Sequence, residues 1–157
     1  MIQDEGLSPV EKLEKYADSD NIFNRQMVAR TILETLRQVM EDKEESMAGD
    51  VTRVFNVVEL LARDTEPSVR AELMEQIPHI AMFCQESETV YPQSQSTLTG
   101  VVPTHLLPLV VKFLTDTNSQ VRKTSQAALL VLLEQGLVET QDVVEQVKFQ
   151  TLRNHHL

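Results

Sequence analysis

Residues 105–133 read HLLPLVVKFLTDTNSQVRKTSQAALLVLL, and this stretch decides the fold. Its apolar residues recur at helical spacing up to Leu114 and again toward its end. Between these two runs lies a turn that opens at Asp116 and holds Thr117 and Asn118, either of which can cap the helix that follows. The stretch therefore predicts two helices joined by a short turn.

A weaker copy of the pattern lies upstream, at residues 57–81, VVELLARDTEPSVRAELMEQIPHIA. Asp64 and Arg70 stand at the same separation as Asp116 and Arg122. When the extra residues of the intervening loop are discounted, the two copies lie about 40 residues apart, which is a helical-repeat period. Because one helical pair cannot bury its apolar face alone, the sequence predicts that such pairs stack.

A third helical pair is predicted at the start of the chain. Ser8 and Glu11 form the pattern of a capping box, and Pro9 suits the first position of a helix. A turn follows, and then a second helix over about residues 23–39. Arg25 lies near the start of this helix, as Arg70 and Arg122 do in the later pairs. The residue before Arg25 is an asparagine, whereas a valine precedes the other two arginines.

Composition narrows the class of protein. The 157 residues are 41% hydrophobic but only 4% aromatic, which favours packed helices over a strand-rich sandwich. The net charge of -10 would repel phosphates, so we expect neither nucleic acid nor a membrane as a partner. The single cysteine, Cys84, cannot form an internal disulfide, and no apolar run approaches the roughly 18 residues of a membrane helix. We expect a cytoplasmic and/or nuclear protein.

The predicted architecture is all-α: a short right-handed α-solenoid of about three helical pairs over residues 8–145. Pro78 lies inside a predicted helix and indicates a kink there. Ser, Thr and Gln with Pro and Gly indicate a flexible loop over residues 85–103, and residues 146–157 are expected to form a frayed tail. The pairs are predicted at residues 8–40, 50–84 and 104–136, followed by a partial fourth.

No motif for catalysis or cofactor binding is present in the sequence. There is no P-loop and no nucleophile elbow, and the four histidines are scattered. His155 and His156 are adjacent in the tail without an acidic neighbour, and His79 is interpreted as a structural residue beside an apolar face. We therefore expect no enzyme, no cofactor and no metal site.

Three segments resemble a known family. Aspartate in the turn and Val-Arg at the start of the second helix are typical of HEAT repeats. Residues 21–30 (NIFNRQMVAR), 68–81 (SVRAELMEQIPHIA) and 120–135 (QVRKTSQAALLVLLEQ) resemble the N-terminal region of subunit-1 type regulatory subunits of protein phosphatase 4. The resemblance covers roughly residues 7–145.

The resemblance implies a non-catalytic regulatory or scaffold subunit. Such a subunit would bind the protein phosphatase 4 catalytic subunit, or a related phosphatase, and direct its choice of substrates. An alternative is a structural interaction module, or a shortened remnant, that no longer binds the phosphatase. The resemblance also implies an inter-repeat ladder, in which turn aspartates pair with helix arginines of neighbouring repeats, for example Asp64 with Arg122. Its members are Asp64, Arg70, Asp116 and Arg122.

Two surfaces are candidates for contacts with other molecules. Turn residues that packing does not need are the candidate partner-binding positions. The end of the last complete pair, around Val110, Phe113 and Leu130, is expected to be partly uncovered and to allow self-association. The candidate partner-binding residues are Ser19, Asp20, Asn21, Thr65, Glu66, Thr117 and Asn118.

Overall fold

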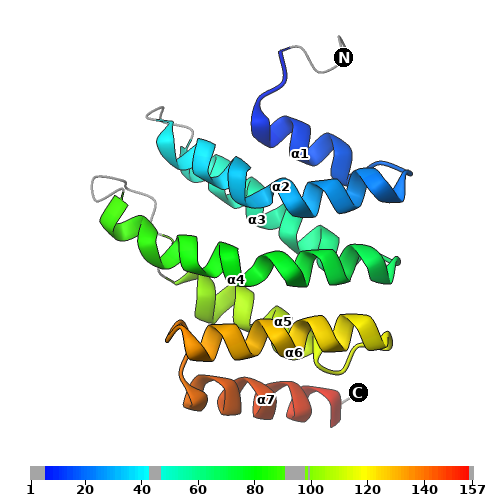
Figure 1. Cartoon of the computed structure of the whole chain (residues 1–157), viewed down its shortest axis with the longest axis vertical. Coiled ribbons are helices and arrows are strands. Elements are labelled where there is room, and N and C mark those ends of the chain that lie inside the picture. Colours follow the sequence, from blue (N-terminus) through cyan, green and yellow to red (C-terminus); the bar gives the residue numbers. More distant parts are fainter. Residues whose placement is uncertain (1–5, 43–46, 91–97, 99, 156–157) are drawn as a thin grey trace.

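A computed structural model describes residues 6–42, 47–90, 98 and 100–155. Over these residues the chain forms helices and no strand, and Figure 1 shows them stacked along one long axis. The elements are α1 (Pro9–Ala17), α2 (Ile22–Glu41), α3 (Met47–Ala62), α4 (Pro67–Val90), the π-helical turn η2 (Val102–Leu106), α5 (Leu107–Phe113), α6 (Ser119–Glu134) and α7 (Thr140–His155).

The helices lie in two layers. Helices α2, α4 and α6 pack on one another in succession, and α1, α3, α5 and α7 form the second layer (Figure 1). Within the stack, α1 packs on α2, α3 on α4 and α5 on α6, and η2 contacts α5 and α4. Helix α7 packs on α5 and takes the place of the first helix of a fourth pair. The predicted all-α solenoid is confirmed.

Local capping explains where several helices begin and end. The Ser8 hydroxyl accepts a hydrogen bond from the Glu11 N–H (3.1 Å), and the Glu11 carboxylate accepts one from the Ser8 N–H (3.1 Å). This is the predicted capping box of α1. Asn21 and Asn118 cap α2 and α6 through their side-chain oxygens. Gly136, with φ 68°, ends α6 in a conformation that favours glycine.

The core runs continuously through the stack. Ile32 of α2, Leu73 and Ile77 of α4, and Leu132 of α6 are fully buried. Each such side chain contributes roughly 1.5–3 kcal/mol when it leaves water. Since these side chains lie between successive helices of one layer, a pair gains most of its stability from its neighbours.

The end of the chain differs from the sequence prediction. Residues 146–157 were expected to fray, but α7 continues to His155, and only residues 156–157 lie outside the described part. Packing on α5 explains the difference: Val143 lies against the core, and the Gln150 side-chain amide donates a hydrogen bond to the Pro108 carbonyl (3.0 Å).

The predicted loop at 85–103 is also shorter than expected. Helix α4 extends to Val90, because Cys84 and Ser87 are buried and the Ser87 hydroxyl donates to the Cys84 carbonyl (2.7 Å). Leu98 is buried, and η2 begins at Val102. The rest of the predicted loop, residues 91–97 and 99, lies outside the described part of the chain.

The start of α3 and the region around Pro78 also differ in detail from the sequence prediction. Helix α3 begins at Met47 rather than at residue 50. Helix α4 runs through Pro78 without a break in its helical structure, and its ribbon changes direction about midway in Figure 1. A bend is expected there because proline lacks the N–H that would bond the preceding turn.

The predicted uncovered end is only partly correct. Val110 and Phe113 are buried, whereas Leu130 is 58% exposed. The prediction failed for the first two residues because α7, expected to be incomplete, packs on α5 and covers them.

Burial of Cys84 gives a prediction about its reactivity. The thiol is fully buried in α4, and this burial raises its pKa to about 12. Since the thiolate is the reactive form, an alkylating reagent at pH 8 should modify the native chain far more slowly than the chain in denaturant. Mass spectrometry of timed samples measures both rates, and equal rates would contradict the burial.

Candidate functional site: a ladder along the turns

The arginine near the start of the second helix of each pair, α2, α4 or α6, folds back onto its own turn. In every case the Nη1 atom donates to the backbone carbonyl six residues earlier. The distances are 2.8 Å from Arg25 to Ser19, 2.6 Å from Arg70 to Asp64 and 2.8 Å from Arg122 to Asp116. One side of each guanidinium is thus fixed to its own repeat.

In Arg25 and Arg70 the other side of the guanidinium reaches the next repeat. Arg25 donates through Nε to Asp64 Oδ2 (2.7 Å) and through Nη2 to Asp64 Oδ1 (3.3 Å). Arg70 contacts both carboxylate oxygens of Asp116, at 3.2 and 3.0 Å. These two-point contacts use the planar geometry of arginine, and the four side chains are only 8–15% exposed. Arg25 and Arg70 therefore each join their own turn to the following one.

The predicted pairing of Asp64 with Arg122 is wrong. Asp64 is held by Arg25 and Asp116 by Arg70, so the contact runs from the arginine of one pair to the aspartate of the next. The reason is geometric: each turn lies beside the start of the second helix of the preceding pair. Arg25 occupies the same place in its helix as the later arginines, although the prediction of ladder residues did not include it.

The aspartates have a second role within their own turns. Asp64 accepts a hydrogen bond from the Glu66 N–H (2.9 Å), and Asp116 accepts one from the Asn118 N–H (2.9 Å). Ser19 makes the equivalent contact in the first turn, where its hydroxyl accepts from the Asn21 N–H (3.1 Å). Serine replaces aspartate at the one turn that no arginine precedes in the described chain. The hydrogen bond within the turn can therefore be made by a side chain without charge, whereas the ion pair with an arginine needs the aspartate.

Burial and hydrogen bonding act in opposite directions on Asp116. Burial favours the neutral acid, but hydrogen bonds from the Arg70 guanidinium and the Asn118 N–H favour the carboxylate more strongly. The pKa of Asp116 is therefore held below its usual value. The ionised form is the one that joins the repeats.

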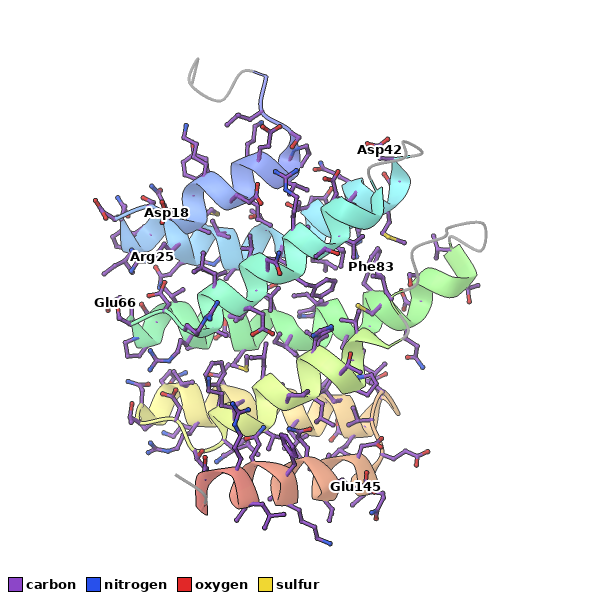
Figure 2. The ribbon with its side chains drawn as sticks, turned by 180° about the vertical axis from the view of Figure 1, so that it is seen from behind. Asp18, Arg25, Asp42, Glu66, Phe83 and Glu145 are labelled. Atoms are coloured by element: carbon purple, nitrogen blue, oxygen red, sulfur yellow. The ribbon has the colours of Figure 1, made fainter. Side chains whose placement is uncertain are left out.

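The candidate partner-binding residues all lie along one edge of the stack. Figure 2 shows this edge, with Asp18, Arg25 and Glu66 near it. Ser19, Asn21 and Asn118 are used within the structure, since their side-chain oxygens accept backbone hydrogen bonds. The Glu66 N–H likewise serves the turn. The remaining three, Asp20, Thr65 and Thr117, are exposed at the tips of the turns.

Further ion pairs between repeats were not predicted. Arg30 of α2 pairs with Glu72 of α4. In the other layer, Arg53 of α3 donates through Nε to Glu14 of α1 (3.1 Å). Partners in both pairs lie about one repeat apart in the sequence, which is the signal that could have identified them.

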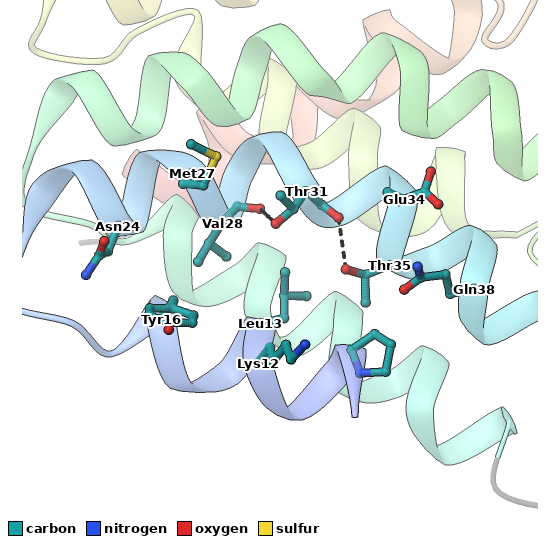
Figure 3. A pocket seen from close by; sticks show the side chains of 11 residues that line it. Lys12, Leu13, Tyr16, Asn24, Met27, Val28, Thr31, Glu34, Thr35 and Gln38 are labelled. Carbon is teal, nitrogen blue, oxygen red and sulfur yellow. Dashed lines mark hydrogen bonds between the residues drawn. The ribbon is translucent and has the colours of Figure 1, made fainter. Parts of the chain in front are cut away.

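A groove of about 560 Å³ lies between α1 and α2 (Figure 3). Leu13, Tyr16 and Met27 supply apolar surface. Thr31 and Thr35 on the same wall donate to the carbonyls of Val28 (3.1 Å) and Thr31 (2.9 Å), respectively, so their hydroxyls are engaged with the α2 backbone. This groove could not be predicted from the sequence, because the apolar pattern of α2 does not show which positions α1 leaves uncovered.

Two other features are absent from the described residues. In this part of the chain, no group of three or more His, Cys, Asp or Glu residues is placed to hold a metal ion. None of the helices described is both long and apolar enough to cross a membrane.

The lowered pKa of Asp116 predicts how stability depends on pH. Folding favours the carboxylate, so its contribution is present above the ordinary aspartate pKa of about 3.9 and is lost as pH falls through the lower folded value. Asp116→Asn should lower the free energy of unfolding at pH 7 by about 1–3 kcal/mol, and the difference from wild type should shrink below about pH 4.

Urea unfolding at several pH values measures this effect. Asp18→Asn is the matched control, because Asp18 is an exposed residue at the end of α1, and it should change stability by less than about 0.5 kcal/mol. An Asp116→Asn cost that stays constant down to pH 2 would contradict the account.

Comparison with known proteins supports the family resemblance that the sequence indicated. The chain is 54% identical over 145 residues to serine/threonine-protein phosphatase 4 regulatory subunit 1 of both Mus musculus and Homo sapiens; the match covers 92% of the chain. A regulatory subunit 1-like protein of Homo sapiens is 43% identical over 117 residues, which cover 74% of the chain and 25% of that protein. No protein-family model matches the chain, and no solved structure matches it.

The chain spans only 14% of the length of the mouse and human regulatory subunits. The segments that carried the resemblance lie in α2, α4 and α6, and these helices also carry the three ladder arginines. Over most of its length, the chain is similar to one part of the serine/threonine-protein phosphatase 4 regulatory subunit 1, as the sequence had indicated.

Proposed function

We propose that the chain is a non-catalytic binding segment that contacts a protein phosphatase 4 type catalytic subunit and helps to direct its choice of substrates. The observation that carries this proposal is the 54% identity over 92% of the chain to regulatory subunits of that phosphatase. The chemistry is assigned to the partner enzyme, and the chain supplies a surface.

The ladder supports a binding role because it holds the turns along one edge of the stack in fixed positions. Arg25 and Arg70 each fix two successive turns, so the turn tips keep a constant spacing. A partner that contacts several tips then does not have to order them first, which lowers the entropic cost of association.

We assign the contact to Asp20, Thr65 and Thr117. All three are exposed, and they come from three successive turns on one edge. The ladder residues below them are largely buried and hold the edge in shape. An acidic turn on a chain of net charge -10 favours a basic patch on the partner.

Capture of purified phosphatase 4 catalytic subunit by the immobilised full chain tests the proposal. The wild-type chain should retain the catalytic subunit, and the variant Asp20→Ala/Thr65→Ala/Thr117→Ala should retain at least about fivefold less, because several rim contacts are lost together.

The matched control removes one acid and two uncharged polar side chains elsewhere. Gln85→Ala, Glu86→Ala and Thr89→Ala alter exposed positions near the far end of α4 and should leave capture unchanged. Circular dichroism verifies that every variant is folded. A folded wild-type chain that captures no catalytic subunit would refute phosphatase binding, and equal capture by both triple variants would refute the assignment to the turns.

A further inference from the structure

The first two residues of α2 are apolar side chains in contact with water: Ile22 is 36% exposed and Phe23 is 79% exposed. When the helices are aligned on their ladder arginines, Phe23 corresponds to Ser68 of α4 and Gln120 of α6. Both of these residues are exposed, and Ser68 is exposed although α4 packs on α2 and on α6. A neighbouring repeat therefore does not cover this position, and the exposure of Phe23 belongs to its place in the repeat.

The aromatic ring at this position is not needed to form the helix. Serine and glutamine hold the same place in α4 and α6. A phenylalanine that stays in water gains none of the free energy that burial of its ring would supply. A large and rigid ring offers a partner much contact area, and little conformational entropy is lost when that ring is fixed. The residue type at this open position therefore favours a role in binding.

The turn before α2 holds the backbone on both sides of Phe23. The Phe23 N–H donates to Asn21 Oδ1 (2.8 Å). The side-chain amide of Asn24 donates to Ser19 Oγ (3.0 Å), and Arg25 Nη1 donates to the Ser19 carbonyl (2.8 Å). The start of the helix is thus tied to the turn by three contacts, and a partner that binds the ring does not have to order the backbone beneath it.

Negative charge lies beside the ring. Asp18 and Asp20, in the turn that leads to Phe23, are both exposed. Figure 2 shows Asp18 and Arg25 near the same edge of the stack, and the Arg25 guanidinium is already paired with Asp64 (2.7 Å). A partner surface that fits this turn therefore combines an apolar pocket with basic side chains at its border.

We propose that Phe23 is the main apolar contact of the turn edge: its ring enters an apolar pocket of the phosphatase 4 type catalytic subunit, and basic side chains at the border of that pocket face Asp20. The inference rests on the proposed function and adds the residue that holds the complex together. Aromatic side chains that fill a pocket, surrounded by weaker polar contacts, are typical of stable interfaces. Phe23 then governs dissociation, while Asp20 governs the rate of encounter.

Binding kinetics separate these two roles. Purified phosphatase 4 catalytic subunit is passed over the immobilised full chain, and the rates are measured by interferometry. Phe23→Ser, which places at this position the residue that α4 has there, should speed dissociation at least about tenfold and change association by less than about twofold. Asp20→Asn should instead slow association, and raised salt should remove that difference from wild type.

The matched control removes the same ring from another exposed position. Phe149 of α7 is 59% exposed and lies at the opposite end of the stack, so Phe149→Ser should leave both rates unchanged. Circular dichroism melts that match wild type establish that each variant is folded.

A fluorine label tests directly whether the ring is covered. The chain contains no tryptophan, so Phe23→Trp prepared with 5-fluorotryptophan carries a single fluorinated residue. A soluble gadolinium chelate should broaden its ¹⁹F signal strongly in the free chain and weakly in the complex with unlabelled catalytic subunit. Phe149→Trp, prepared in the same way, should be broadened equally in both states.

The outcomes distinguish this inference from the proposed function. A folded wild-type chain that does not bind the catalytic subunit overturns both. Binding by wild type with unchanged dissociation of Phe23→Ser, or equal broadening of the label at position 23 in the free and bound chain, overturns the role of Phe23 alone. Sedimentation that shows a dimer of the chain, dissociated by Phe23→Ser, also overturns it, because a second copy would then cover the ring.

Discussion

The structure depends on a guanidinium that is shared between two repeats. Arg25 and Arg70 each bind a backbone carbonyl of their own turn with one nitrogen and the aspartate of the next turn with two others. The contact is directional: it runs from the arginine of one pair to the aspartate of the next pair. Ser19 occupies in the first described turn the place that Asp64 and Asp116 occupy in the later turns.

Hydrophobic burial and the ladder have different roles. Buried side chains such as Ile32 and Ile77 supply most of the free energy of stacking, but apolar contacts alone tolerate sliding along a helix. A bidentate ion pair tolerates far less displacement, so the ladder fixes the register of each pair against the next. For the proposed binding role, this register matters because it sets the spacing of the exposed turn tips.

Local features could be predicted from the sequence, and features that depend on packing could not. The capping box at Ser8 follows from a few adjacent residues, and so does the cap of α6, which was predicted at Thr117 or Asn118 and is Asn118. The repeated spacing identified the positions of Asp64 and Arg70. The direction of the ladder could not be deduced, because it depends on which turn lies beside which helix. Helix α7 has little apolar periodicity of its own, and its order comes from packing on α5. The groove beside Met27 likewise exists only because of how α1 crosses α2.

A double-mutant cycle tests the central claim most directly. The free energies of unfolding of wild type, Arg70→Gln, Asp116→Asn and the double variant give the coupling between the two side chains. If the arginine of one pair binds the aspartate of the next pair, the coupling between Arg70 and Asp116 should be about 1 kcal/mol or more. Asp64 and Arg122 should then show no coupling. Coupling between Asp64 and Arg122, with none between Arg70 and Asp116, would contradict the account.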